Sequence, residues 1–282
     1  MLNVMIGLAP MAGYTDAAFR MLCRKAGAEI AYTEMVSAEA LVRGKTEIMV
    51  RRGDSPLAVQ LFGSRERALI EAAGIAEKKA DFIDLNAGCP SPDLTDTGAG
   101  AALLRKPKAL AELAAAISST TKKPASVKIR LGWNSNDCVK ICKLLDKADV
   151  TRIAIHGRTM KQGFSGKADW KAIGKAKEAV TCEIYGNGDL RDAEDAREKV
   201  ATFRLDGALI GRAALGNPAV FGKKTDKRKA FLEWMRDSAD FSAAKRQAMA
   251  FSRGLPEAKK MRNGIARAEN ASGLKAIFSD KG

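Results

Sequence analysis

Histidine is almost absent from this sequence, and cysteine is scarce. The 282 residues include one histidine, His156, and five cysteines, with no CxxC pair among them. An odd number of cysteines does not suit a disulfide framework, and a zinc site needs Cys or His ligands at short spacing. We therefore expect neither a disulfide framework nor a metal site, and a reducing cytoplasm is the compartment that fits.

Long apolar runs are also missing. The opening stretch MLNVMIGLAPMAG is apolar but short, lacks a basic start, and soon reaches Asp16 and Arg20. A secretory signal begins with a basic region, and a transmembrane helix needs about 20 apolar residues. The stretch is therefore predicted to be a strand, and no membrane partner is expected.

Acidic residues are outnumbered by basic ones. The chain has 33 Asp and Glu against 48 Lys and Arg, for a net charge of +15. Residues 223–282 alone hold 15 basic and seven acidic side chains, a net charge of +8. An ordinary solvated surface can be basic, but such a bias on a short segment favours a polyanionic partner. Nucleic acid is the first candidate.

Strand-like and helix-like stretches alternate from residue 1 to about residue 221. Alternating β and α units indicate a parallel sheet, and eight of them in this length favour a (β/α)8 TIM barrel over an open sheet. Helical periodicity is present at 17–26, 65–79 and 107–120. The region 35–56 is least regular, with a helix predicted at 35–43 and a loop or short strand after it. The eight predicted strands are 4–9, 30–34, 57–62, 82–86, 125–131, 152–156, 182–186 and 207–211.

The composition changes after Gly222. Lys, Arg, Ala, Met and Phe recur at helical spacing, and β-branched residues become rare. The sequence therefore predicts two domains, a barrel at 1–222 and a small α-helical domain at 223–282. Breaks between its helices are expected near 254–256 and near Gly273, where glycine and proline disfavour helix.

A cysteine-bearing loop follows the predicted strand at 82–86. The segment 86–100 reads NAGCPSPDLTDTGAG, and its glycines and prolines predict irregular backbone around Cys89. A thiol on a loop after a parallel strand lies where α/β enzymes place their chemistry. An inert packing cysteine is the alternative, and the residues of this stretch leave both interpretations open.

Polar residues and glycines gather at the predicted carboxyl ends of the strands. In a TIM barrel these ends meet on one face, and the ends of the last two strands commonly bind phosphate. A phosphate-bearing cofactor is therefore expected. Lys128 lies in an apolar strand, where an unpaired ammonium is costly, and His156 ends a strand. The residues concerned are Pro10, Met11, Ala12, Gln60, Asn86, Cys89, Lys128, Arg130, His156, Arg158, Asn187, Gly188, Asp189, Gly211 and Arg212.

These residues lie in motifs that resemble the tRNA-dihydrouridine synthase family, flavin enzymes that reduce uridines in tRNA. The motifs run in family order through the barrel region. They are LAPMAGYTDAAFR (8–20), VQLFGS (59–64), DLNAGCPSP (84–92), GAGAALL (98–104), SVKIRLG (126–132), HGRTMKQGFSGKADW (156–170), YGNGDL (185–190) and ALIGRAALGNP (208–218).

The resemblance implies an FMN-binding barrel, a helical tRNA-binding domain, and NAD(P)H as reductant. Because the sequence has no separate dinucleotide motif, NAD(P)H is expected to enter the same open face. It implies that Cys89 donates a proton, and that Asn86 and Arg158 lie near the substrate. A monomer is expected. The positions implied to bind FMN are Pro10, Met11, Ala12, Gln60, Lys128, His156, Asn187, Gly188, Asp189, Gly211 and Arg212.

Two features depart from the family pattern. The loop after Cys89 reads Ser91-Pro92-Asp93, without the lysine often found in bacterial members, and the helical tail is short.

The sequence leaves two other functions open. An FMN barrel acting on a free small molecule, like dihydroorotate dehydrogenase, is the alternative from the same chemical class. A catalytically silent RNA-binding barrel is the alternative from another class. The basic tail disfavours the first, and the complete set of polar strand ends disfavours the second.

Overall fold

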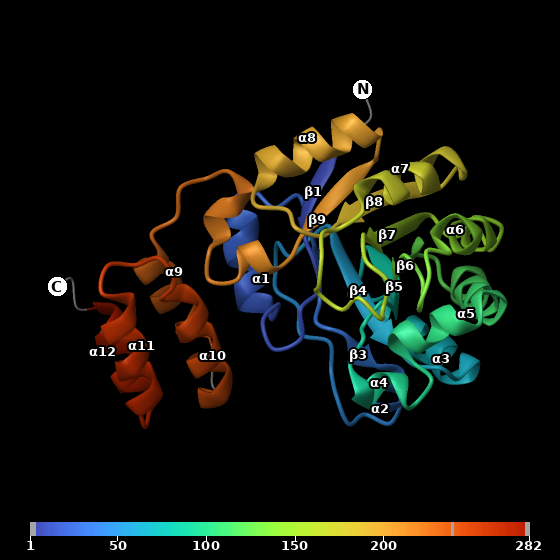
Figure 1. Cartoon of the computed structure of the whole chain (residues 1–282). Helices are drawn as coiled ribbons and strands as arrows, with labels where there is room; N and C mark the ends of the chain where they lie inside the picture. The colour runs from blue at the N-terminus through green and yellow to red at the C-terminus, as the bar shows by residue number, and fades with distance from the viewer. Residues whose placement is uncertain (1–3, 238–239, 280–282) are drawn as a thin grey trace.

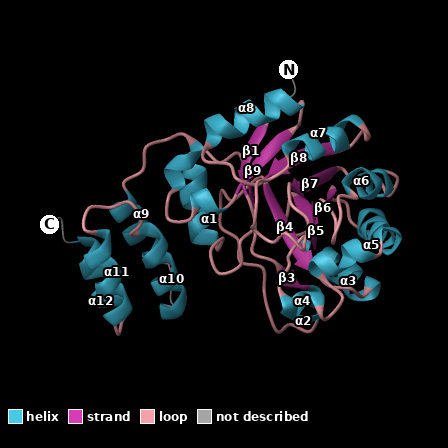
Figure 2. Cartoon of the chain, viewed as in Figure 1, coloured by secondary structure: helices cyan, strands magenta, loops and turns pink. Residues whose placement is uncertain are grey.

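Eight parallel strands of the described residues close into a barrel at the centre of the molecule (Figure 2). The computed structural model describes residues 4–237 and 240–279. The sheet order is β2-β1-β9-β8-β7-β6-β5-β4-β3, and pairing of β2 with β4 closes the ring. The barrel strands are β1 (Met5–Leu8), β2 (Ile30–Tyr32), β4 (Leu57–Phe62), β5 (Phe82–Ala87), β6 (Ala125–Arg130), β7 (Arg152–His156), β8 (Glu183–Asn187) and β9 (Gly207–Ile210).

Helices surround the barrel and alternate with its strands (Figure 1). Each of the eight predicted strands overlaps an observed one, so the prediction of a (β/α)8 barrel is confirmed. The predicted helices at 17–26, 65–79 and 107–120 are confirmed as well. The outer helices are α1 (Ala17–Lys25), α3 (Glu66–Ala76), α5 (Pro107–Thr120), α6 (Cys138–Asp146), α7 (Trp170–Glu178) and α8 (Ala193–Phe203). Shorter helices are α4 (Pro92–Thr95), η1 (Gly100–Arg105), η2 (Arg212–Ala214) and η3 (Pro218–Phe221).

The region 35–56 differs in part from the prediction of a helix starting at Met35. The short strand β3 (Val36–Ser37) pairs with β4, and the helix α2 (Ala38–Val42) begins only after it. Ser37 marks this start, because its Oγ accepts a hydrogen bond from the Ala40 N–H at 3.2 Å. Such a cap satisfies a backbone donor that has no partner within the helix.

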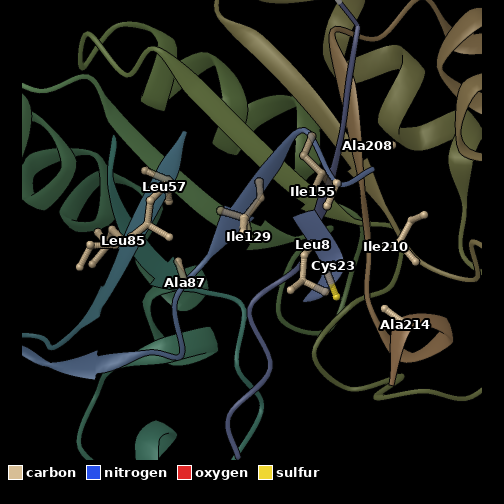
Figure 3. Close-up of a cluster of buried hydrophobic side chains, with 14 of the residues drawn as sticks. Leu8, Cys23, Leu57, Leu85, Ala87, Ile129, Ile155, Ala208, Ile210 and Ala214 are labelled. Carbon is tan, nitrogen blue, oxygen red and sulfur yellow. The ribbon is translucent and has the colours of Figure 1, made fainter. Parts of the chain in front are cut away.

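Alternate side chains of each strand lie on opposite faces of the sheet. On β5, Ile83 and Leu85 join the large apolar cluster between barrel and helices, while Asp84 and Asn86 bond to side chains of neighbouring strands. Figure 3 shows part of the apolar cluster, with Leu85, Ile129 and Ile155 from three adjacent strands. The side chains that point into the barrel therefore include the polar groups that lie together at one of its ends.

Four helices follow the barrel and lie beside α1, on one side of it (Figure 1). Phe231, Trp234, Phe251 and Phe278 are buried among them. The helices are α9 (Lys227–Trp234), α10 (Phe241–Phe251), α11 (Ala258–Arg267) and α12 (Ala271–Ser279). The predicted division between 1–222 and 223–282 stays a prediction, since these helices also pack on the barrel.

The predicted break near 254–256 is confirmed, but the one near Gly273 is wrong. Gly273 lies inside α12, and α11 ends before Ala268. Asn270 is the residue that signals the new helix, because its Oδ1 accepts from the Gly273 N–H at 2.9 Å. A capping side chain thus outweighs the modest helix penalty of one glycine.

The loop between β1 and α1, residues 9–16, holds the C-terminal helices to the barrel. Gln247 of α10 donates from Nε2 to the Tyr14 carbonyl at 2.9 Å, and Trp234 of α9 donates from Nε1 to the Asp16 carboxylate at 2.9 Å. Phe251 packs edge-on against Phe19 of α1, with ring centroids 6.2 Å apart. Within the described residues, no helix has the length and apolar character needed to cross a membrane.

Candidate active site

A cavity of about 660 Å³ opens at the carboxyl ends of the strands. Every residue singled out from the sequence for cofactor, substrate or catalysis lines it, except Arg158. The cavity also takes in residues that the sequence did not single out, among them Met35 and Phe164. The lining residues are Ala9, Pro10, Met11, Ala12, Met35, Gln60, Asn86, Gly88, Cys89, Pro90, Lys128, Arg130, His156, Phe164, Asn187, Gly188, Asp189, Leu190, Arg191, Gly211, Arg212 and Ala213.

A chain of hydrogen bonds crosses the floor of this cavity from β5 to the cysteine loop. Asp84, which is fully buried, accepts from Gln60 Nε2 at 2.7 Å and from Ser126 Oγ at 2.6 Å. Gln60 Oε1 in turn accepts from Asn86 Nδ2 at 2.8 Å, and Asn86 Oδ1 accepts from the Cys89 N–H at 2.9 Å. An ionised carboxylate only accepts, so Asp84 fixes the direction of both amides.

Burial raises the pKa of Asp84 to about 6, although hydrogen bonds from Ser126 and Gln60 and the charge of Lys128 oppose the rise. Asp84 was missed in the sequence, where it stands between apolar residues of a strand. A carboxylate in such a run was the signal, because an unpaired one is costly to bury.

Cys89 lies on the cavity wall, half-buried, and its loop is held by backbone contacts. The Ala101 N–H donates to the Cys89 carbonyl at 2.9 Å. Gly100 makes this close approach possible: its φ is +59°, and a Cβ there would lie 2.8 Å from the same carbonyl oxygen. The loop thus fixes the Cys89 backbone from both sides.

Lys128 and Arg130 are two residues apart on β6, so both side chains lie on the same face of the strand and line the cavity. Lys128 Nζ lies 3.3 Å from Asn187 Oδ1. Burial lowers the pKa of Lys128 to about 8, helped by the charge of Arg130 and opposed by Asp84. Lys128 is therefore mostly cationic at neutral pH and loses that charge in mild alkali. Arg130 donates from Nε to the Gly88 carbonyl at 2.9 Å, which ties β6 to the cysteine loop.

His156 is neutral in this setting. Burial, followed by the charges of Lys128, Arg130 and Arg158, lowers its pKa to about 2. Arg158 Nη1 lies 3.3 Å from His156 Nε2, and a guanidinium can only donate, so Nε2 accepts and the ring proton is on Nδ1. His156 can therefore offer a ligand a neutral ring but no positive charge.

Arg158 is not among the residues that line the cavity, and its expected place near the substrate stays a prediction. Its side chain is only 2% exposed and bonds to the Ser165 and Gly166 carbonyls and to the Asp189 carboxylate, at 3.0, 2.6 and 2.7 Å. These bonds hold the loop after β7 and the residue after Gly188. Arg158 acts on the cavity by positioning Asp189.

The ends of β8 and β9 give room and positive charge. Gly188 has a φ of +124°, and a Cβ on it would lie 2.8 Å from the Ala168 Cβ. A Cβ on Gly211 would project into cavity space, with no neighbouring atom nearer than 3.8 Å. Arg212 lies beside them and pairs with Asp189 at 3.3 Å. Burial alone would raise the pKa of Asp189, but the hydrogen bond from Arg158 keeps it below its usual value.

Phe164 is an exposed aromatic ring at the rim of the cavity. It is 56% exposed, and the guanidinium carbons of Arg212 and Arg130 lie 4.4 and 5.7 Å from its ring centroid. The sequence placed Phe164 inside a family motif but gave no sign of its position. Among the described residues, no three His, Cys, Asp or Glu side chains gather in a way that could hold a metal ion.

The fold is a TIM barrel with a cavity at the carboxyl ends of its strands, which is where TIM-barrel enzymes have their active sites. Solved structures agree on the fold: 2-naphthoyl-CoA reductase in complex with 2-naphthoyl-CoA has a TM-score of 0.60 at 12% identity, covering 77% of this chain and 49% of that one. A variant of NCR from Zymomonas mobilis has a TM-score of 0.54 at 15% identity, covering 82% of this chain and 87% of that one.

The family follows from the sequence comparisons. The family model described as dihydrouridine synthase (Dus) matches residues 7–273, and the chain belongs to this family. A probable tRNA-dihydrouridine synthase of Aquifex aeolicus is 34% identical, covering 95% of this chain and 92% of the relative. tRNA-dihydrouridine synthase B of Pseudomonas putida is 38% identical over 76% of this chain and 66% of its own length.

Proposed function

We propose that this protein reduces uridine in tRNA to 5,6-dihydrouridine, with FMN as cofactor and NAD(P)H as reductant. The observation that carries the proposal is a single cavity in which a thiol, a cation and the glycine ends of two strands face one another. Membership of the dihydrouridine synthase family supports the same reaction. The basic residues of 223–282 support tRNA as the partner.

The cavity residues fit a flavin mononucleotide. Gly188, Gly211 and Arg212 would hold the phosphate, because Gly188 allows the backbone turn, Gly211 leaves open space and Arg212 supplies charge. Gln60, Lys128 and Asn187 would meet the polar edge of the ring, and Pro10, Met11 and Ala12 would form an apolar wall. FMN bound there and reduced by NAD(P)H would supply the hydride for C6 of the uracil.

The protein's own groups supply charge and the proton. Lys128, as a cation, stabilises negative charge at the polar edge of the cofactor. Cys89 donates its Sγ proton to C5 of the uracil as the C5=C6 double bond is lost, and the resulting thiolate regains a proton from water. Asn86, held by Gln60, also lines the cavity and would lie beside the uracil under this proposal.

The target base must leave its stack to reach this cavity, which lies at the end of the barrel. Phosphate contacts to basic side chains hold the RNA without reading its sequence. The protein acts on tRNA as a monomer in the cytoplasm under this proposal.

Cys89→Ala tests the proposed chemistry. The variant should keep FMN and its reduction by NAD(P)H, but react about 10²- to 10⁴-fold more slowly with tRNA, the usual contribution of a positioned acid. The measurement is single-turnover oxidation of pre-reduced enzyme by unmodified tRNA, with dihydrouridine mapped by mass spectrometry. Oxidation at the wild-type rate would remove Cys89 from the mechanism. Failure of the wild-type protein to take up FMN would overturn the proposal as a whole.

A further inference from the structure

A second and larger hollow lies on the outer wall of the barrel, at α5 and α6. Its volume is about 1190 Å³. Five lysines line it, and all five are exposed: Lys106 and Lys108 at the start of α5, and Lys140, Lys143 and Lys147 along α6 and just beyond it. We call this hollow the lysine groove. None of its residues belongs to the cavity described above.

The five ammonium groups have no carboxylate partner among the described residues, whose ion pairs all lie elsewhere. Two aspartates line the groove, but both are bonded to their own surroundings. Asp137 accepts from Ser135 Oγ at 2.7 Å, and Asp146 accepts from the Cys182 N–H at 2.9 Å and Thr181 Oγ1 at 3.1 Å. The groove therefore carries five positive charges against two negative ones, and the folded chain leaves this excess of positive charge without an ion-pair partner.

The place of the groove relates it to the active site. Helices α5 and α6 begin after β5 and β6, at the end of the barrel where the active-site cavity opens. In Figure 1, α5 and α6 lie on the side of the barrel away from α9–α12, with the strands between them. The cavity is thus flanked by the basic C-terminal helices on one side and by the lysine groove on the other.

We propose that the lysine groove binds the ribose–phosphate backbone of the tRNA, at a part of the tRNA distant from the uridine in the cavity. This inference rests on the proposed function. Lysine is a point charge on a flexible stem, which suits contact with phosphates and leaves base identity unread. Binding there would release counterions and add affinity without adding sequence preference. A folded tRNA is large enough to contact both flanks of the barrel at once.

The test is a triple charge reversal on α6, Lys140→Glu, Lys143→Glu and Lys147→Glu, in the full-length FMN-loaded enzyme. All three side chains are exposed, so the core is unaffected. The matched control is Lys78→Glu, Lys175→Glu and Lys199→Glu, which changes the total charge equally on other outer elements. Each protein is assayed with unmodified tRNA and with a short unmodified hairpin that carries only the target uridine and its stem.

The groove variant should bind whole tRNA at least about tenfold more weakly than the control, and its slope of log affinity against log salt should fall by about two to three. Its affinity for the hairpin, and its single-turnover rate with the hairpin, should match the control. Equal losses on tRNA and hairpin, or tRNA affinity no weaker than that of the control variant, would overturn the inference. A wild-type enzyme inactive on both RNAs would instead count against the proposed function.

Discussion

Replacing Asp84 with Asn should remove the pH dependence that this buried carboxyl gives to the stability of the barrel. Asn keeps the shape and the contacts, since its Oδ1 can accept from Gln60 Nε2 and its Nδ2 can donate to Ser126 Oγ. What it removes is an ionisable group whose pKa burial raises from 3.8 to about 6. A carboxyl with a raised pKa stabilises the fold below its unfolded pKa, and that stability is lost as pH rises through the folded value.

The magnitude follows from the two pKa values. A carboxyl with a pKa of 3.8 in the unfolded chain and about 6 in the folded one loses roughly 1 kcal/mol of unfolding free energy between about pH 5 and pH 7. The Asp84→Asn protein has no such term. Its free energy of unfolding, relative to wild type, should therefore rise by about this amount over the same interval. Lys128, with a pKa of about 8, titrates above it.

The assay is urea unfolding of flavin-depleted protein at several pH values, so that cofactor affinity makes no contribution. Asp146→Asn is the matched control. Burial alone would raise the pKa of Asp146, but backbone hydrogen bonds from Cys182 and Thr181 keep it below 3.8, so its contribution to stability changes only at more acid pH. The difference between the control and wild type should be flat over the interval. Parallel pH profiles for Asp84→Asn and wild type would refute the burial argument.

Three further predictions test other parts of the molecule. Lys128→Met should weaken FMN retention at neutral pH, and retention by wild type should fall toward that of the variant as pH rises through about 8, measured by flavin fluorescence on dilution. Gly100→Ala should displace the Cys89 carbonyl and slow oxidation by tRNA while FMN stays bound; a normal single-turnover rate would contradict the role of that glycine. Deleting 223–282 should weaken tRNA binding strongly and lower the melting temperature of the barrel, because it uncovers Phe19; calorimetry showing an unchanged transition would contradict this.

The barrel was predictable because its strands alternate with helices and its buried runs are short and apolar. The strand ends were predictable for the same reason, since parallel strands bring their carboxyl ends to one face. Local chemistry marked smaller features less clearly. Asn270 and Ser37 each cap the start of a helix. The predicted helix bounds missed both, because they rested on a glycine and on periodicity and not on capping residues.

What the sequence left out are contacts between segments far apart in the chain. Arg158 stands beside His156 in a family motif, but only the folded loop shows that its donors are used by carbonyls and by Asp189. Asp84 and Phe164 are similar cases. Asp84 accepts hydrogen bonds from two neighbouring strands, and Phe164 is an exposed ring that two arginine side chains approach. Hydrophobic periodicity indicates which face of a helix or strand a residue occupies. It does not indicate which residues that side chain contacts.

The loop at 9–16 contributes both to the cavity and to the contact with the C-terminal helices. Ligand binding and helix docking are therefore thermodynamically linked. Its first part, Pro10 to Ala12, lines the cavity, while Tyr14 and Asp16 bond to Gln247 and Trp234 of the C-terminal helices. A ligand that binds more tightly when the C-terminal helices are docked on this loop must favour their docking. Docking must then raise the affinity for the ligand by the same factor. The change in cofactor affinity on docking of the tail and the change in docking on cofactor binding then measure one coupling free energy.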